Sequence, residues 1–248
     1  MNRSYLLTRS VLVALICILP TAASLGDDPA LQLRKGDHIS IIGNTLADRM
    51  QHDAWLETYL QAMHPNHELS VRNLGFAGDE VKTRPRSKSF GSPNEWLSKT
   101  ETNVVFCFFG YNEALRGEAG LAGFRKDLGE VIDGMLAQKY DGQTTPTLVF
   151  FSPIAHEDLK NPNLPDGQEN NANLSKYTTA MKEVCQQKGV LFVDLFHPTQ
   201  ERYKSSPQPL TMNGIHLLES GNRELADIIT RALFDQQLSK GVSGAELD

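Results

Sequence analysis

Short apolar runs alternate with segments of helical periodicity along most of this chain. The five runs of strand length are residues 38–42, 69–73, 104–109, 147–151 and 191–194. Between them apolar side chains recur at three- and four-residue spacing, as at Leu121, Phe124 and Leu128. Alternation of this kind is typical of consecutive βαβ units, and it predicts a parallel sheet covered by helices on both faces.

The strand count predicts the fold class more closely. Five parallel strands between two helical layers form a flavodoxin-like, three-layer α/β/α fold. We expect Gly189 to end one helix and Ser220 to begin the last one. Residues 75–100 and 152–171 are rich in Gly, Pro, Asn and charge, so we expect irregular loops there. Because both follow strands, they should wall a cleft at the carboxyl edge of the sheet.

The beginning of the chain has the layout of a secretory signal peptide. Arg3 and Arg9 precede the apolar run from Val11 to Leu19, and small residues follow it. We therefore expect residues 1–24 to be removed and the protein to be exported, to the periplasm or outside the cell. The apolar run is short for a membrane span, and Cys17 lacks the small neighbours of a lipoprotein signal, so no membrane anchor is expected after cleavage.

The remaining boundaries are a connector at 25–34, one α/β domain at 35–236 and a polar tail at 237–248. Loss of residues 1–24 removes two Arg and no acid, which takes the formal net charge from −6 to −8. A charge of this sign excludes nucleic acid and anionic membranes as expected partners. Cys107 and Cys185 are predicted to be buried apolar side chains, with no disulfide.

Four small polar clusters carry the candidate chemistry. They are Gly43-Asn44-Thr45-Leu46, Asn73 through Gly78-Asp79, Gly110-Tyr111-Asn112-Glu113 and Asn213-Gly214-Ile215-His216. In a parallel sheet the first three meet at one edge, and the fourth can reach it. Thr45 offers a hydroxyl and His216 a base, while the Gly78 N–H and the Asn112 amide are donors of the kind that stabilise an oxyanion. Together they are the groups from which an acyl-transfer mechanism can be written.

In their order and approximate spacing these clusters resemble the SGNH hydrolases, also called GDSL esterases, from about Lys35 to Leu233. In that family the blocks read Gly-Asp-Ser-Leu with a nucleophilic Ser, an oxyanion Gly, Gly-X-Asn, and Asp-X-X-His. The resemblance implies a nucleophile at Thr45, an oxyanion hole at Gly78 and Asn112, and a base at His216 oriented from position 213. It implies a carboxylic ester substrate, conceivably an acylated or acetylated carbohydrate, and no cofactor.

Two residues depart from the family pattern, and both fall on the catalytic triad. Thr45 stands in place of Ser, and its methyl group restricts χ1 and adds bulk. Asn213 stands in place of Asp; it can bond to an imidazole but gives no negative charge and can hold the wrong tautomer. In a serine protease the same Asp-to-Asn change costs about 10⁴ in turnover. The alternative to a slow esterase is therefore a weak or inactive ligand-binding module.

Several other residues are weaker candidates. Tyr111, Arg84 and Arg86 could bind substrate, and Trp55 and Trp96 could stack on a sugar. Ser152 is the replacement nucleophile, and Glu113 a replacement for the missing carboxylate; Asp79 and Asp194 are expected to order loops. The sets His156-Glu157-Asp158 and His64 with His67 could hold a metal, but neither has zinc spacing, so no metal site is expected.

Overall fold

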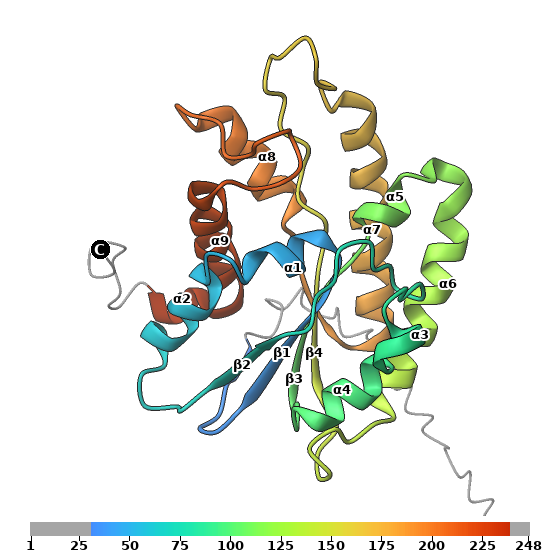
Figure 1. The fold of residues 1–248 in the computed structure, drawn as a ribbon, viewed down its shortest axis with the longest axis vertical. Helices are drawn as coiled ribbons and strands as arrows, with labels where there is room; N and C mark the ends of the chain where they lie inside the picture. Colours follow the sequence, from blue (N-terminus) through green and yellow to red (C-terminus); the bar gives the residue numbers. More distant parts are fainter. Residues whose placement is uncertain (1–30, 239–248) are drawn as a thin grey trace, which may run out of the picture.

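The computed structural model describes residues 31–238, and it contains the predicted parallel sheet (Figure 1). The strands are β1 (His38–Gly43), β2 (Ser70–Asn73), β3 (Val104–Phe108), β4 (Thr147–Phe151) and β5 (Leu191–Val193). Their order is β2-β1-β3-β4-β5, and every neighbouring pair is parallel. The flavodoxin-like, three-layer α/β/α fold is therefore confirmed, and the strand ends differ from the predicted ones by one residue at most.

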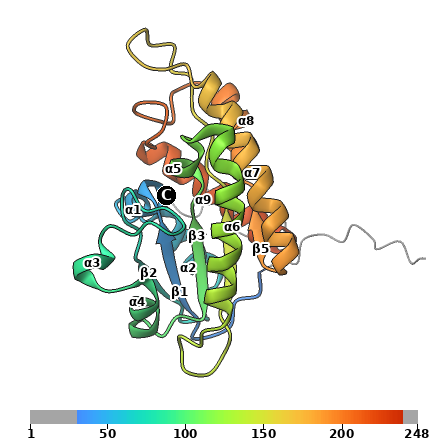
Figure 2. The ribbon, with the colours of Figure 1, turned by 90° about the vertical axis from the view of Figure 1, so that its right-hand side faces the viewer.

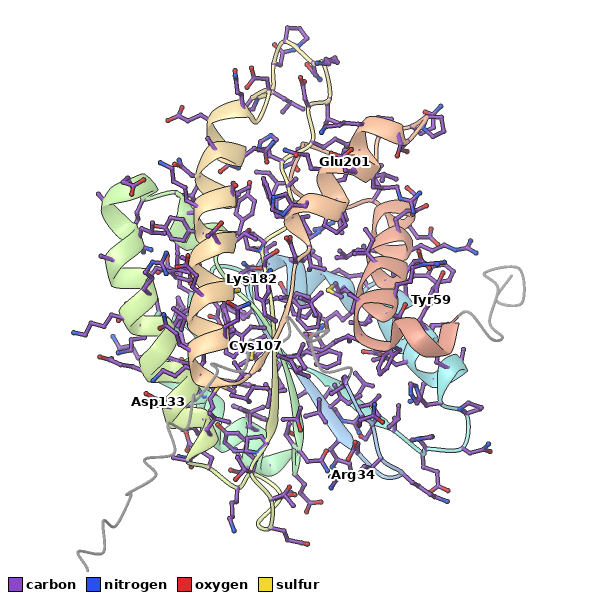
Figure 3. All side chains as sticks on the ribbon, turned by 180° about the vertical axis from the view of Figure 1, so that it is seen from behind. Arg34, Tyr59, Cys107, Asp133, Lys182 and Glu201 are labelled. Atoms are coloured by element: carbon purple, nitrogen blue, oxygen red, sulfur yellow. The ribbon has the colours of Figure 1, made fainter. Side chains whose placement is uncertain are left out.

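Two layers of helices cover the sheet. One face packs against α1 (Thr45–Met50), α2 (Trp55–Met63) and α9 (Glu219–Leu238). The other packs against α4 (Pro93–Lys99), α6 (Gly117–Leu136) and α7 (Gln168–Lys188). Alternate residues of one strand enter opposite layers, as Phe106 and Cys107 do. In Figures 1 and 2 helices α6 and α7 run side by side, and in Figure 3 Cys107 lies at the centre of the packed side chains.

The segment 75–100 is more regular than the sequence analysis expected. It contains α3 (Ser87–Phe90) and α4, so the prediction of an irregular loop is wrong for its second half. Helix α4 begins with Pro at its first position, and Ser92 and Glu95 form a capping box. Each satisfies a backbone N–H that the first helical turn leaves without a partner. This capping motif was missed because the prediction relied on the Gly, Pro, Asn and charge content of the whole segment.

The helix ends give a mixed outcome. Gly189 caps α7 in the left-handed conformation, as expected. Ser220 is not an N-cap, because α9 already begins at Glu219. Met50, Leu56, Leu60 and Met63 recur at helical spacing, but α1 and α2 are separate helices, and Ala54 between them has φ of 53°. Helices α5 (Tyr111–Ala114) and α8 (Phe196–Ser205) follow β3 and β5 directly and were not predicted.

The boundaries of the domain are partly visible. Leu31, in the expected connector, is buried and donates its N–H to the Leu233 carbonyl. The expected signal peptide and the end of the polar tail lie outside the described residues. Within residues 31–238 no helix has the length and apolar character that a membrane crossing requires. Cys107 and Cys185 are free and buried, as predicted, and burial raises the pKa of both thiols, that of Cys185 to about 12.

Candidate active site

A cavity of about 220 Å³ lies beyond the carboxyl ends of β1, β3 and β4. Its walls are mixed apolar and polar and come from Asn44, Thr45, Leu46, Arg49, Phe108, Phe109, Tyr111, Asn112, Ser152, Pro153, Ile154, Ile215, His216, Leu217 and Asn222. Thr45, Tyr111, Asn112 and His216, from three of the four predicted clusters, therefore meet in one place. The cavity has room for a small acyl group.

Thr45 is held at the first position of α1 by a tight strand-to-helix turn. The preceding Gly43 has φ of 147°, and a Cβ there would approach the Phe108 carbonyl oxygen to 2.3 Å, so only glycine fits. Asn44 caps the helix by accepting from the Leu46 N–H at 3.0 Å, and its own N–H donates to the Phe108 carbonyl at 3.0 Å. These bonds present the Thr45 side chain at the cavity wall.

His216 is oriented by Asn213, in a way that fixes the ring tautomer. The Asn213 Oδ1 accepts from the backbone N–H groups of His216 at 3.0 Å and Ile215 at 3.3 Å. The amide nitrogen must then face the ring, and it lies 3.0 Å from His216 Nδ1. Because an amide nitrogen only donates, Nδ1 is the acceptor and the ring proton sits on Nε2. In this arrangement Nε2 has no lone pair to take a proton from a hydroxyl.

The environment of His216 favours its neutral form. Burial lowers the pKa of the ring below its usual value, and the positive charge of Arg49 lowers it further. Arg49 also lines the cavity. Arg49 and His216 therefore share one wall-lining set, and the Arg49 charge acts on the ring.

The loop that carries His216 is anchored by Glu157. Its Oε2 accepts from the Thr211 N–H at 2.7 Å and the Thr211 hydroxyl at 2.6 Å, while both carboxylate oxygens accept from the Leu210 N–H. The Glu157 N–H in turn donates to the Gly214 carbonyl at 2.9 Å. The carboxylate is thus used inside the protein, which explains the His156-Glu157-Asp158 motif without a metal.

His156 packs directly under the same loop. A Cβ at Gly214 would lie 2.4 Å from His156 Nε2, and Gly214 has φ of 88°, so this position requires glycine. On its other side the His156 Nδ1 lies 3.1 Å from the Asn170 amide nitrogen, which also donates to the Tyr111 hydroxyl at 2.6 Å. Burial raises the pKa of Tyr111 to about 12, so its phenol stays protonated at the cavity wall.

Asn112 and Gly78 occupy different positions relative to the cavity. Asn112 lines it, and one N–H of its amide donates to the Asp79 carbonyl at 3.1 Å. The second N–H of that amide is left for a ligand. Gly78 is exposed on the adjoining loop, with φ of 88°, and does not line the cavity. The shared oxyanion hole stays a prediction.

Ser152 lines the cavity but its hydroxyl is fully used. It is 1% exposed, accepts from the Leu195 N–H at 2.8 Å and the Phe196 N–H at 3.1 Å, and donates to the Pro153 carbonyl. A hydroxyl held in this way joins β4 to the start of α8. This arrangement argues against Ser152 as the replacement nucleophile.

Arg84 and Arg86 do not line the cavity with Thr45. The Arg84 guanidinium lies 4.2 Å from the centre of the Phe109 ring, bonds to the Glu80 carbonyl and is 3.8 Å from the Asp79 carboxylate. Arg86 donates to the Leu74 carbonyl at 3.2 Å and lies over the Phe76 and Phe90 rings. Both side chains therefore bind the loop that follows β2.

The other weak candidates also have structural partners. Glu113 accepts from the Val81 N–H at 2.8 Å and the Gly110 N–H at 2.9 Å, so it makes no contact with His216. Asp194 pairs with His197 at 2.6 Å.

The tryptophans and the remaining histidines do not line the cavity. Trp96 stacks on Phe90, and Trp55 packs edge-on against Tyr59. His64 bonds to the Leu60 carbonyl and packs against His67. In the part of the chain that the structure describes, no group of three metal-binding side chains comes together.

Comparison with known proteins identifies the family. The model of the GDSL-like lipase/acylhydrolase family matches residues 36–224, which include all four clusters. The chain belongs to this family. A search of curated proteins found no match to this GDSL-like chain.

Solved structures of low sequence identity share its fold. An acetylxylan esterase, Axe2 from Geobacillus stearothermophilus, superposes with a TM-score of 0.64 at 17% identity, over 82% of this chain and 97% of that one. A protein from Parabacteroides merdae described as a putative GDSL-like lipase superposes with a TM-score of 0.66 at 14% identity, over 83% of this chain and 99% of that one. A gut microbial diltiazem-metabolizing enzyme, BT4096, superposes with a TM-score of 0.68 at 17% identity, over 84% of this chain and 49% of that one. The Axe2 variants described as catalytic mutants replace a serine, an aspartate and a histidine.

Two cavity residues of this GDSL-like chain were missed by sequence reasoning. Arg49 lies four residues after Thr45, which places both on one side of a helix. This spacing could have predicted that Arg49 lines the same cavity as Thr45. Asn222 enters from α9, and its amide nitrogen donates to the Asp53 carboxylate. No local pattern connects Asn222 with the cavity, because the contact depends on how α9 packs.

Proposed function

We propose that the protein is an exported carboxylic ester hydrolase that works through an acyl-enzyme, with Thr45 as nucleophile and His216 as base. The observation that carries the proposal is the meeting of Thr45, His216 and Asn112 at one cavity of a GDSL-like fold. Each brings a group that acyl transfer requires: a hydroxyl, an imidazole and an amide donor.

The proposed reaction has two halves. The Thr45 Oγ1 attacks the ester carbonyl carbon while His216 Nε2 takes its proton, and the Asn112 N–H stabilises the oxyanion, with the Gly78 N–H as the second expected donor. The carbonyl re-forms, the alcohol leaves with the proton from His216, and the acyl group remains on Thr45. Water, deprotonated by the same ring, then attacks the acyl carbon; the bond from that carbon to Thr45 Oγ1 breaks, Oγ1 takes the proton back from His216, and the carboxylic acid leaves.

Asn213 makes this reaction slow. The bond from its amide nitrogen to His216 Nδ1 holds the proton on Nε2, the atom that must be unprotonated to accept from Thr45. Turnover therefore needs the ring to change tautomer, and no negative charge at position 213 stabilises the imidazolium that forms. We expect a rate well below that of a GDSL esterase with Asp at this position.

The cavity volume limits the substrate. About 220 Å³ suits an acetyl or other short acyl group. We propose an acylated carbohydrate as substrate, on the basis of the expected export and of the likeness in fold to an acetylxylan esterase.

A direct assay tests the proposal. The purified protein should hydrolyse 4-nitrophenyl acetate and acetylated xylo-oligosaccharides, and Thr45→Ala and His216→Ala should each reduce the rate to that of buffer. His197→Ala is the matched control, because His197 is exposed, pairs with Asp194 at the surface and does not line the cavity. Wild-type rates in Thr45→Ala would overturn the assignment of the nucleophile.

One observation favours a second function. The tautomer held by Asn213 suits a binding site without turnover, since Nε2–H is then a fixed donor toward the cavity. A protein of this kind would bind an acylated sugar with the same affinity before and after long incubation. It would release no acid above the His216→Ala background.

A further inference from the structure

Arg49 is the one charged side chain among those that line the cavity, apart from the titratable His216. Every other polar member of the wall is a neutral amide or hydroxyl: Asn44, Thr45, Tyr111, Asn112, Ser152 and Asn222. No Asp or Glu is among the lining residues. The wall therefore carries a net positive charge although the protein as a whole is acidic.

The guanidinium of Arg49 has no acidic partner among the described residues. Its Nε is buried and without a hydrogen-bond partner there, and no ion pair joins Arg49 to a carboxylate within residues 31–238. The Asp53 carboxylate accepts from the amide nitrogen of Asn222, which lines the cavity. A partly buried cation without a counter-charge is costly, and an anionic ligand removes that cost.

We propose that this cavity binds a small carboxylate, with the charge of the ligand against the Arg49 guanidinium. Arginine presents several N–H groups in one plane, a geometry that matches the two oxygens of a carboxylate. The apolar walls from Phe108, Ile154 and Leu217 then cover the hydrocarbon part of the ligand. The size of the cavity, about 220 Å³, suits a ligand whose hydrocarbon part is short.

The inference deepens the proposed function and partly rests on it. If the site hydrolyses esters, the carboxylate belongs either to an anionic ester substrate or to the acid released by the reaction. These sources differ in kinetics: an anionic substrate has a lower KM than its neutral analogue, whereas a product acid inhibits competitively. Binding of a carboxylate requires no turnover, so it is measurable even if no ester is cleaved.

The test compares butyrate with butyramide, which match in size and differ in charge, by calorimetry on the wild-type protein. We expect butyrate to bind about tenfold to a hundredfold more tightly. Arg49→Gln should abolish this preference and Arg49→Lys should restore part of it. Arg125→Gln, at a surface pair with Glu183, should change nothing.

A second readout uses the wild type alone. Saturating butyrate should raise the pKa of His216 measured by NMR, because the added negative charge offsets that of Arg49 on the ring. Butyramide should leave it in place. Equal affinity for the two ligands, or a preference that persists in Arg49→Gln, would overturn the proposal. Carboxylate preference without ester cleavage would retain it while rejecting hydrolysis.

Discussion

Asn213→Asp is the substitution with the most definite expected effect. In the wild type the Asn213 amide nitrogen lies 3.0 Å from His216 Nδ1 and donates to it. A carboxylate in the same position can only accept, so it should move the ring proton from Nε2 to Nδ1. The Nε2 lone pair is then available to accept a proton, as the proposed transfer from Thr45 requires. NMR of isotope-labelled histidine distinguishes the two tautomers directly.

The same substitution should raise the pKa of His216. Opposite unit charges about 4 Å apart interact by about 4 kcal/mol at an effective dielectric constant near 20. His216 is only partly buried, so solvent screening reduces this to roughly half. At 1.36 kcal/mol per pKa unit, the expected rise is about 1.5 units.

The rate should follow the tautomer. Burial and Arg49 lower the pKa of His216 in the wild type, so the ring stays neutral and the acid limb of the pH–rate profile lies below pH 6.5. In Asn213→Asp that limb should move to higher pH, while kcat on 4-nitrophenyl acetate rises by about 10²- to 10⁴-fold. An Nδ1–H tautomer already present in the wild type, or an unchanged rate in the variant, would refute the reasoning.

Further predictions follow from other parts of the structure. Thr45→Ser combined with Asn213→Asp should raise kcat by a factor that differs from the product of the two single effects, as steady-state kinetics can measure, because the residues of a triad act as a unit. Ser152→Ala should lower the free energy of unfolding by about 1–3 kcal/mol in urea titrations, since two buried N–H groups lose their acceptor; an unchanged stability would contradict this role. Gly214→Ala should destabilise the protein by more than about 2 kcal/mol, because its Cβ would overlap the His156 ring, and a wild-type melting temperature would disprove the close packing. Mass spectrometry of the native protein should find an N-terminus near residue 25, and an intact Met1 would rule out the signal peptide.

The fold could be predicted from the sequence because its signals are local and repeated. The central strands are short, buried apolar runs, and all five strands appear in the sheet within one residue of their expected ends. Helix α4 was missed although Ser92, Pro93 and Glu95 mark its start, because the composition of the whole segment was given more weight than this motif. Helix α8 has only ten residues and weak apolar periodicity, and Phe196 at its start packs in the core.

The candidate site was predictable to a lesser degree. The order of the clusters and the parallel sheet were enough to bring Thr45, Asn112 and His216 to one cavity. The direction of the Asn213 amide was not, since it depends on which atoms accept from the backbone of its own turn. The engagement of Ser152 likewise depends on β5 and α8, which are distant in sequence.

The central claim is that acyl transfer occurs at Thr45, and trapping of the acyl-enzyme tests it most directly. The Asn213→Asp protein would be mixed with 4-nitrophenyl acetate, quenched in acid within the first turnover, digested and analysed by peptide mass spectrometry. The account predicts one acetyl group on the peptide that contains Thr45, and its absence in Asn213→Asp with Thr45→Ala. An acetyl group on another residue in both proteins, or hydrolysis of the ester with no acylated peptide, would contradict it.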